Sequence, residues 1–305
     1  TPWLINPEME GGQVGRIMAT AHQGNHIADL SVQVQLPDEW DPNLARVNVG
    51  ISAVVETDKC NPKWVECCNQ MDAVIVPSNH AKECLERSGN LETKVHVVPE
   101  WFFPEIVNSD FSKNKLSNAK FETDFNFLII SQLTGQSPQT DRKNILFAIK
   151  WICETFKDDK DVGIILKTNH GRGTHIDRKL TTNMIKSVLS EVRTGEFPKV
   201  HLVHGNLMPE EVAGLYHNPS VKAFVSLTRG EGFGLPLLES AAAGLPVITT
   251  NWSAHTEFLS LGRFIGINYD LIQVPEEKVD ERIFVSGIKW ADPHEDDFKE
   301  KILKF

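Results

Sequence analysis

The stretch "RGEGFGLPLLE" (residues 229–239) combines three glycines in five positions with two glutamates eight positions apart. Gly230, Gly232 and Gly234 allow the backbone to bend sharply and to approach a ligand without side-chain obstruction. Pro236 suits the first turn of a helix, whose N-terminus carries about half a positive charge and attracts anions such as phosphate. The pattern therefore predicts a phosphate-binding turn before a helix, although turns of this composition are also common as purely structural elements.

The two glutamates indicate what else the ligand carries. Glu231 falls in the predicted loop and Glu239 near the start of the predicted helix, so both carboxylates can face one cleft. A carboxylate beside a phosphate is unfavourable unless it accepts hydrogen bonds from hydroxyl groups, such as those of a ribose or a hexose. A ligand with both phosphates and sugars accounts for the mixture, and a nucleotide sugar is such a ligand.

The bulk composition is that of a globular protein of two domains. The chain has 305 residues, 41% of them hydrophobic and 24% charged. No apolar run approaches the ~18 residues of a membrane span, and the sequence shows no basic-then-apolar leader. Peripheral membrane contact stays open, without a signal for it in the sequence. The formal net charge of −10 argues against a nucleic-acid partner. Five cysteines without metal-ligand spacing indicate reduced thiols, and we expect a cytoplasmic protein without a metal site.

Strand-sized apolar runs alternate with helical patterns along the chain, which predicts parallel, doubly wound sheets. The expected strands are residues 2–5, 29–36, 45–55, 73–77, 94–99, 125–130, 162–167, 199–205, 221–227 and 246–250. Residues 105–124 are polar and aperiodic, so we expect a linker between an abbreviated N-terminal domain (1–104) and a C-terminal domain (125–305). Ligands of such sheets bind outside the carboxyl ends of the strands, in the cleft between the domains.

The motif and its neighbours resemble a known family. "EGFGLPLLESAAAGLPVITTNWSAHTEFL" (231–259) resembles the donor-binding motif of retaining glycosyltransferases of family 4, the glycosyl transferases group 1. Residues 74–89, 127–149 and 205–234 resemble other segments of the same family. The resemblance implies an α/β protein of the GT-B fold, with two Rossmann-like, doubly wound domains facing a central cleft.

The resemblance assigns roles in donor binding to the glutamate motif. Glu239 would hold the ribose hydroxyls of the nucleotide, and Glu231 would contact the transferred sugar. The backbone after Glu231 would touch the sugar and the phosphates; these donor-binding positions are Gly232, Phe233, Gly234 and Leu235.

Cations are expected beside the diphosphate. Arg142 and Lys143 lie in the loop after the first strand of the C-terminal domain, where they would neutralise it and act in catalysis. Lys167, at the end of the next strand, is a further donor-binding candidate, with a solvated lysine as the alternative. The family commonly has Gly-Arg where this chain has Ser131-Gln132, so we expect Arg142 to supply the missing charge.

The N-terminal domain contributes weaker candidates. Gly11 and Gly12 occupy the place of the family's glycine-rich loop and would approach the donor across the cleft. Glu56 and Asp58 follow a predicted strand and would line the acceptor side, or alternatively cap the helix that begins near Pro62. The junction "VVPEWFFPE" (97–105) replaces the family's usual Pro-Asn-Gly-Val-Asp.

The resemblance implies a retaining, metal-independent glycosyltransferase without an enzymic nucleophile. It would move a sugar from a nucleotide-diphosphate donor, with UDP or GDP as the nucleotide, to a hydroxyl of a glycan, a lipid-linked acceptor or another molecule. The nucleotide sugar is then a co-substrate, and no cofactor is expected. Two alternatives stay open, a sugar-nucleotide epimerase and a non-catalytic carbohydrate-binding or scaffold protein on the same fold.

Overall fold

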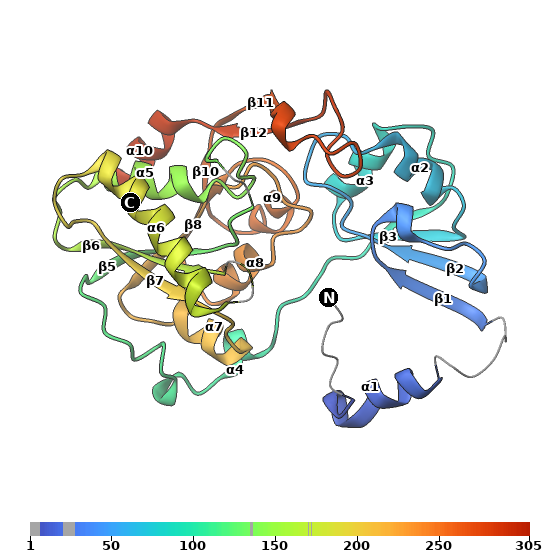
Figure 1. The fold of residues 1–305 in the computed structure, drawn as a ribbon, viewed down its shortest axis with the longest axis horizontal. Coiled ribbons are helices and arrows are strands. Elements are labelled where there is room, and N and C mark those ends of the chain that lie inside the picture. Colours follow the sequence, from blue (N-terminus) through green and yellow to red (C-terminus); the bar gives the residue numbers. More distant parts are fainter. Residues whose placement is uncertain (1–6, 21–27, 135–136, 170, 172) are drawn as a thin grey trace.

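The computed structural model describes residues 7–20, 28–134, 137–169, 171 and 173–305. The expected strand at 2–5 lies outside the described residues. The described chain forms two parallel sheets, each with its own helices, and a separate two-stranded hairpin (Figure 1). Within these ranges, every helix is too short or too polar to span a bilayer.

The first domain is built on a four-stranded parallel sheet, in the order β1-β2-β3-β4. Its strands are β1 (Ala28–Val34), β2 (Ala45–Ile51), β3 (Ala73–Val76) and β4 (Val95–Val97), and its helices are α1 (Met9–Thr20), α2 (Pro62–Cys68) and α3 (Asn79–Glu86). Asn61 caps α2 and Ser78 caps α3, each by accepting a backbone N–H in the first turn. Helix α1 lies apart from both sheets (Figure 1).

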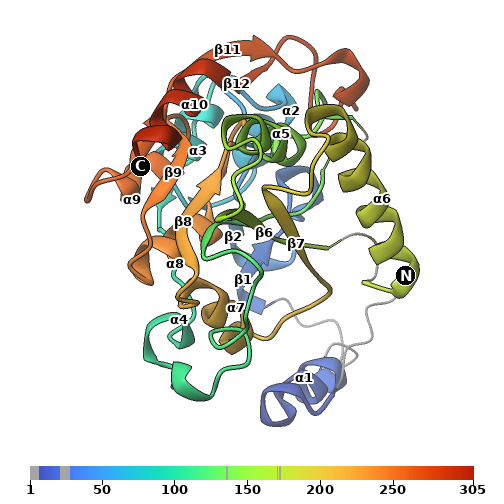
Figure 2. The same ribbon diagram turned by 90° about the vertical axis from the view of Figure 1, so that its left-hand side faces the viewer.

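The second domain is built on a six-stranded parallel sheet, in the order β10-β9-β8-β5-β6-β7. Figure 2 shows β9, β8, β6 and β7 of this sheet in that sequence. Its strands are β5 (Phe125–Ile130), β6 (Val162–Thr168), β7 (Lys199–His204), β8 (Val221–Ser226), β9 (Val247–Thr250) and β10 (Ile265–Ile267). Its helices are α5 (Ile145–Thr155), α6 (His175–Val192), α7 (Pro209–Tyr216), α8 (Leu235–Ala242), α9 (His255–Leu259) and α10 (Glu295–Lys304). All residues of the inner strand β6 are buried, as a strand covered on both faces requires.

The polar segment 105–124 does not cross freely between the domains. It begins with the short helix α4 (Glu105–Asn108), and Ile106 is buried in the core of the second domain. The carbonyl of Ile106 lies 2.8 Å from Nε2 of His217 at the end of α7. The segment therefore lies along the second domain over much of its length.

Residues 269–293 join the two domains through a shared core, which the sequence pattern did not lead us to expect. The hairpin strands β11 (Tyr269–Gln273) and β12 (Lys289–Pro293) follow the second sheet in the chain. Trp290 and Phe284 nevertheless belong to the hydrophobic cluster that contains Trp64 of the first domain. The C-terminal part of the chain thus completes the core of the N-terminal part.

Trp290 should therefore support both domains at once. Its side chain is fully buried, so we expect Trp290→Ala to lower the free energy of unfolding by about 3–5 kcal/mol. Because the core is shared, urea unfolding followed by circular dichroism should remain a single transition with an earlier midpoint. Leu261→Ala, at a residue 88% exposed, is the control and should change little. Two separate transitions in the wild-type protein would contradict the shared core.

Candidate active site

The glutamate loop (residues 228–234) connects β8 to α8 and is pressed against the first domain. A Cβ atom at Gly230 would lie 2.1 Å from the carbonyl oxygen of Glu56, and one at Gly232 would lie 2.9 Å from that of Ala53. Gly234 has a φ of +103° and forms the left-handed N-cap of α8. Two of the three glycines thus serve close packing between the domains, and the third serves the turn into the helix.

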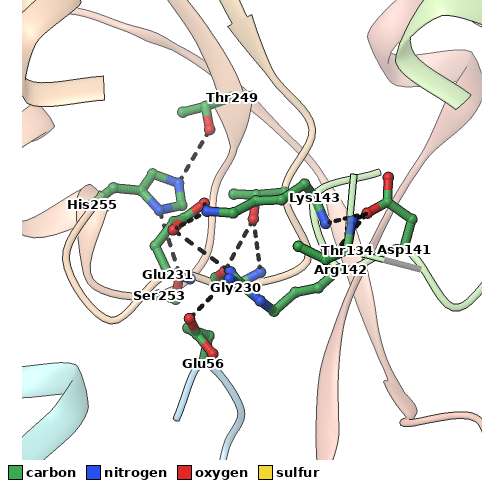
Figure 3. Close-up of polar contacts among 11 residues, drawn as sticks. Glu56, Thr134, Asp141, Arg142, Lys143, Gly230, Glu231, Thr249, Ser253 and His255 are labelled. Atoms are coloured by element: carbon green, nitrogen blue, oxygen red, sulfur yellow. Dashed lines mark hydrogen bonds and ion pairs between the residues drawn. The ribbon is translucent and has the colours of Figure 1, made fainter. Parts of the chain in front are cut away.

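Glu231 is buried among cations (Figure 3). The ammonium nitrogen of Lys143 lies 2.7 Å from each of its carboxylate oxygens, and Nη1 of Arg142 lies 3.6 Å from Oε2. Burial by itself would raise the pKa of Glu231, but the charges of Lys143 and Arg142 together lower it to about 2. The carboxylate therefore stays ionised at neutral pH, where it can accept hydrogen bonds but cannot donate a proton.

Arg142 joins the glutamate loop to the first domain. Its Nη2 lies 2.9 Å from Oε1 of Glu56, and its Nη1 donates to the carbonyl oxygen of Gly230 at 2.6 Å. Its own carbonyl accepts from the backbone N–H of Arg229 at 2.8 Å. Of the residues expected on the acceptor side, Glu56 thus reaches the site.

The loop that carries Arg142 and Lys143 is held in place by hydrogen bonds to Asp141. The carboxylate of Asp141 is buried and accepts from the backbone N–H of Ile145 at 2.9 Å and from the hydroxyl of Thr134 at 2.8 Å. These bonds set the entry into α5, where Asn144 adopts a left-handed conformation with a φ of 55°. Asp141 therefore orients the loop from which Arg142 and Lys143 project.

A second set of buried polar groups supports Glu231 from the other side (Figure 3). The backbone N–H of Glu231 donates to Oγ of Ser253 at 2.9 Å, and Ser253 lies 3.4 Å from Nδ1 of His255. Nε2 of His255 lies 2.8 Å from the carbonyl oxygen of Thr250. Burial lowers the pKa of His255, so the ring is neutral, and Nε2 can donate to Thr250 while Nδ1 accepts from Ser253.

Cavity A, of about 380 Å³, opens beside Lys143 at the carboxyl ends of β5 and β6. Its lining residues are Ile130, Ser131, Gln132, Lys143, Lys167, Thr168, Asn169 and Pro236. Two of these are cations, and Pro236 brings in the first turn of α8. The hydroxyl of Thr168, one of the lining residues, is buried without a hydrogen-bond partner among the described residues.

Cavity B, of about 360 Å³, adjoins cavity A, since both are lined by Ile130, Lys167 and Asn169. Its further lining residues are Phe103, Asn206, Leu207, Pro209, Val212 and Glu239. Glu239 accepts a hydrogen bond from the hydroxyl of Tyr216 at 2.9 Å. Burial raises the pKa of Glu239, against the lowering effect of that hydrogen bond.

Of the residues that line both cavities, Lys167 is the one with a positively charged side chain. Its side chain is largely buried and donates to the carbonyl oxygen of Gly205 at 2.7 Å. Burial lowers its pKa, because a lysine out of water is harder to keep charged. An anion in the cavity would favour the charged form again.

Three other candidates lie elsewhere. Gly11 and Gly12 belong to α1, apart from the glutamate loop, and a Cβ atom on either would meet nothing within 4 Å. Asp58 bonds to the backbone of Lys289 in β12 at 2.9 Å and 2.6 Å, so it ties the hairpin to the first domain. The alternative that Glu56 or Asp58 caps α2 is wrong, because Asn61 holds that position.

Several residues of the site escaped the sequence interpretation: Thr168, Tyr216, Ser253, His255 and Phe103. Only Thr168 carried a usable signal, because it directly follows Lys167, the last residue of the predicted strand 162–167. A larger cavity of about 490 Å³ lies between the first domain and residues 281–288, and none of the expected site residues lines it. Among the described residues, no group of His, Cys, Asp or Glu is arranged to hold a metal ion.

Comparisons with known proteins find a family match within the second domain. The family model described as Glycosyl transferases group 1 matches residues 190–270, which include the glutamate loop, α8 and β9. A search of curated protein sequences returned no match.

Solved structures resemble the chain at low sequence identity. The pneumococcal O-GlcNAc transferase GtfA, in complex with UDP and GlcNAc, is 15% identical with a TM-score of 0.54, over 94% of this chain and 51% of that one. TarM of S. aureus is 14% identical with a TM-score of 0.54, over 85% and 43%. OtsA is 10% identical with a TM-score of 0.57, over 79% and 62%.

The chain therefore spans about half the length of GtfA and TarM. At such identities the likeness shows the fold, and it confirms the α/β class expected from the sequence. The chain has the GT-B fold, and its segment 190–270 matches the glycosyl transferases group 1.

Proposed function

We propose that the protein is a nucleotide-sugar-dependent glycosyltransferase. The observation that carries the proposal is that cavities A and B adjoin. Cavity A places two lysines beside the start of α8, and cavity B contains the carboxylate of Glu239. A diphosphate fits the first arrangement and a ribose the second. The match of residues 190–270 to glycosyl transferases group 1 supports the same assignment.

The diphosphate would lie in cavity A. Lys143 and Lys167 supply charge there, and the first turn of α8 supplies the positive end of a helix dipole. Gln132 lines the same cavity and carries no charge, so Lys167 supplies the cation that the family's usual arginine would provide. Arg142 does not appear among the described residues that line either cavity, although the sequence favoured it for this role.

The nucleoside would lie in cavity B. Glu239 is positioned to accept hydrogen bonds from vicinal ribose hydroxyls, and Tyr216 holds its carboxylate in place. Phe103 and Leu207 give the same cavity an apolar wall suited to a base. The complexes of GtfA and TarM contain UDP, which makes UDP the first nucleotide to test, with GDP next.

The sugar would lie at the end of cavity A nearest Glu231. An ionised Glu231 accepts from sugar hydroxyls and does not act as a general acid. We infer transfer without a metal ion, because the charge that develops on the departing diphosphate falls among Lys143, Lys167 and the start of α8. Retention and the absence of an enzymic nucleophile are what the resemblance of residues 231–259 to retaining glycosyltransferases implies. The acceptor would be a hydroxyl of a glycan, a lipid-linked acceptor or another molecule.

Lys167→Met tests the assignment of cavity A. The variant keeps the length of the side chain but removes its charge, so we expect UDP affinity in isothermal titration calorimetry to fall about 10- to 150-fold, the equivalent of ~1.5–3 kcal/mol. Lys160→Met, at an exposed lysine, is the matched control and should bind like the wild type.

Wild-type protein that binds none of UDP, GDP, ADP or TDP at millimolar concentration would end the enzyme proposal. Binding of a nucleotide sugar with neither transfer nor hydrolysis would favour the carbohydrate-binding alternative. A product that retains the nucleotide but carries an epimerised sugar would favour the epimerase.

The low pKa of Glu231 predicts a pH-dependent contribution to stability. The pKa is lowered from 4.5 to about 2 on folding, so the ionised side chain contributes fully above about pH 4.5 and its contribution is lost as the pH falls toward 2. The difference in free energy of unfolding between wild type and Glu231→Gln, measured in urea, should therefore shrink between pH 5 and pH 3. Glu277→Gln, at an exposed glutamate, should show no such trend. A constant difference for Glu231→Gln would contradict the ionised, cation-held carboxylate.

A further inference from the structure

Arg142 is a cation that, among the described residues, lines neither cavity A nor cavity B. Its side chain is 13% exposed, and it contacts Glu56, Gly230 and Glu231. Its neighbour Lys143 lines cavity A, whereas Arg142 is absent from the described lining of both cavities. Lys143 thus lines a cavity, whereas its neighbour Arg142 binds groups of the protein itself.

The guanidinium is planar, and its two terminal nitrogens bind groups from different domains (Figure 3). Nη2 pairs with Glu56, which follows β2 of the first domain, and Nη1 binds the carbonyl oxygen of Gly230 in the second domain. Both carboxylates in reach of Arg142 are partly or fully withdrawn from water, at 26% exposure for Glu56 and 10% for Glu231. A pair with this geometry holds its position better than an exposed one.

The backbone confirms how closely the two sides meet. The carbonyl oxygen of Glu56 lies 2.1 Å from the position that a Cβ atom of Gly230 would take, and the hydroxyl of Ser78 donates to the carbonyl oxygen of Gly232 at 2.8 Å. Glu257, at the other side of the contact, accepts from the backbone N–H of His80 at 2.8 Å. The position of the glutamate loop therefore depends on the first domain being seated against it.

We propose that Arg142 and Glu56 are positioning residues that couple the seating of the first domain to the placement of Glu231. With Glu56 in place, Arg142 is held at 3.6 Å from Glu231 and leaves both carboxylate oxygens of Glu231 to Lys143. Without Glu56, Arg142 is drawn to Glu231 and competes with Lys143, and the loop loses its anchor. This inference rests on the proposed function, in which Glu231 contacts the transferred sugar.

Glu56→Gln and Arg142→Lys in the full chain test the proposal. Gln keeps the shape of Glu56 without its charge, and Lys keeps the charge of Arg142 without the fork that reaches two partners. The readouts are UDP affinity by calorimetry and the rate of UDP release from saturating UDP-GlcNAc in water. We expect UDP affinity within about threefold of wild type and a rate at least about tenfold lower for both variants.

The matched control is Glu39→Gln. Glu39 pairs with Arg282 at 2.7 Å in another contact between the first domain and residues 269–293, but at an exposed position. It should keep both the affinity and the rate. If Glu56→Gln or Arg142→Lys weakens UDP binding tenfold at an unchanged saturating rate, Arg142 acts on the diphosphate and the positioning role is overturned. Unchanged values of both readouts overturn it as well.

A crystal structure of the Glu56→Gln protein separates this inference from the proposed function. The expected result is a displaced glutamate loop, with the guanidinium of Arg142 moved onto Glu231. An unmoved loop overturns the positioning role whatever the protein binds. If wild type binds none of UDP, GDP, ADP or TDP, the proposed function fails, while this structural test still decides the inference.

Discussion

The absence of space for a side chain at Gly230 is the constraint on which the site depends. The glutamate loop can reach the carbonyl of Glu56 only because glycine stands there, and that approach brings Arg142 and Glu56 into contact across the domains. The same seating places Glu231 in front of Lys143, where two cations keep it ionised despite burial. The glycines that suggested a phosphate turn thus act chiefly by allowing two domains to touch.

The shared hydrophobic core stabilises the contact between the glutamate loop and the first domain. Trp290 and Phe284 come from the end of the chain but pack with Trp64 of the first domain, so the domains are joined by apolar burial as well as by the linker. Polar contacts join the same two parts of the chain, since the carboxylate of Asp58 accepts a hydrogen bond from the backbone of β12. A site formed by residues of two domains requires that the domains keep one relative position, and the packing of residues 269–293 on the first domain provides this.

Local patterns of the sequence predicted the class of fold, and the family resemblance predicted its GT-B architecture. Alternating strands and helices predicted the two parallel sheets. The rule that ligands bind at strand ends led to Lys167, and the glutamate motif led to Glu239; both line cavity B. What the sequence could not provide were pairings between distant segments. No local periodicity predicts such pairings. Examples are the ion pair of Arg142 with Glu56, the hydrogen bond from Tyr216 to Glu239 and the packing of β12 on the first domain.

The location of a bound nucleotide tests the account most directly. A crystal structure of the protein with UDP should show the diphosphate between the ammonium groups of Lys143 and Lys167 at the start of α8, with the ribose hydroxyls on Glu239. A nucleotide bound outside cavities A and B, for instance in the cavity between the first domain and residues 281–288, would contradict it.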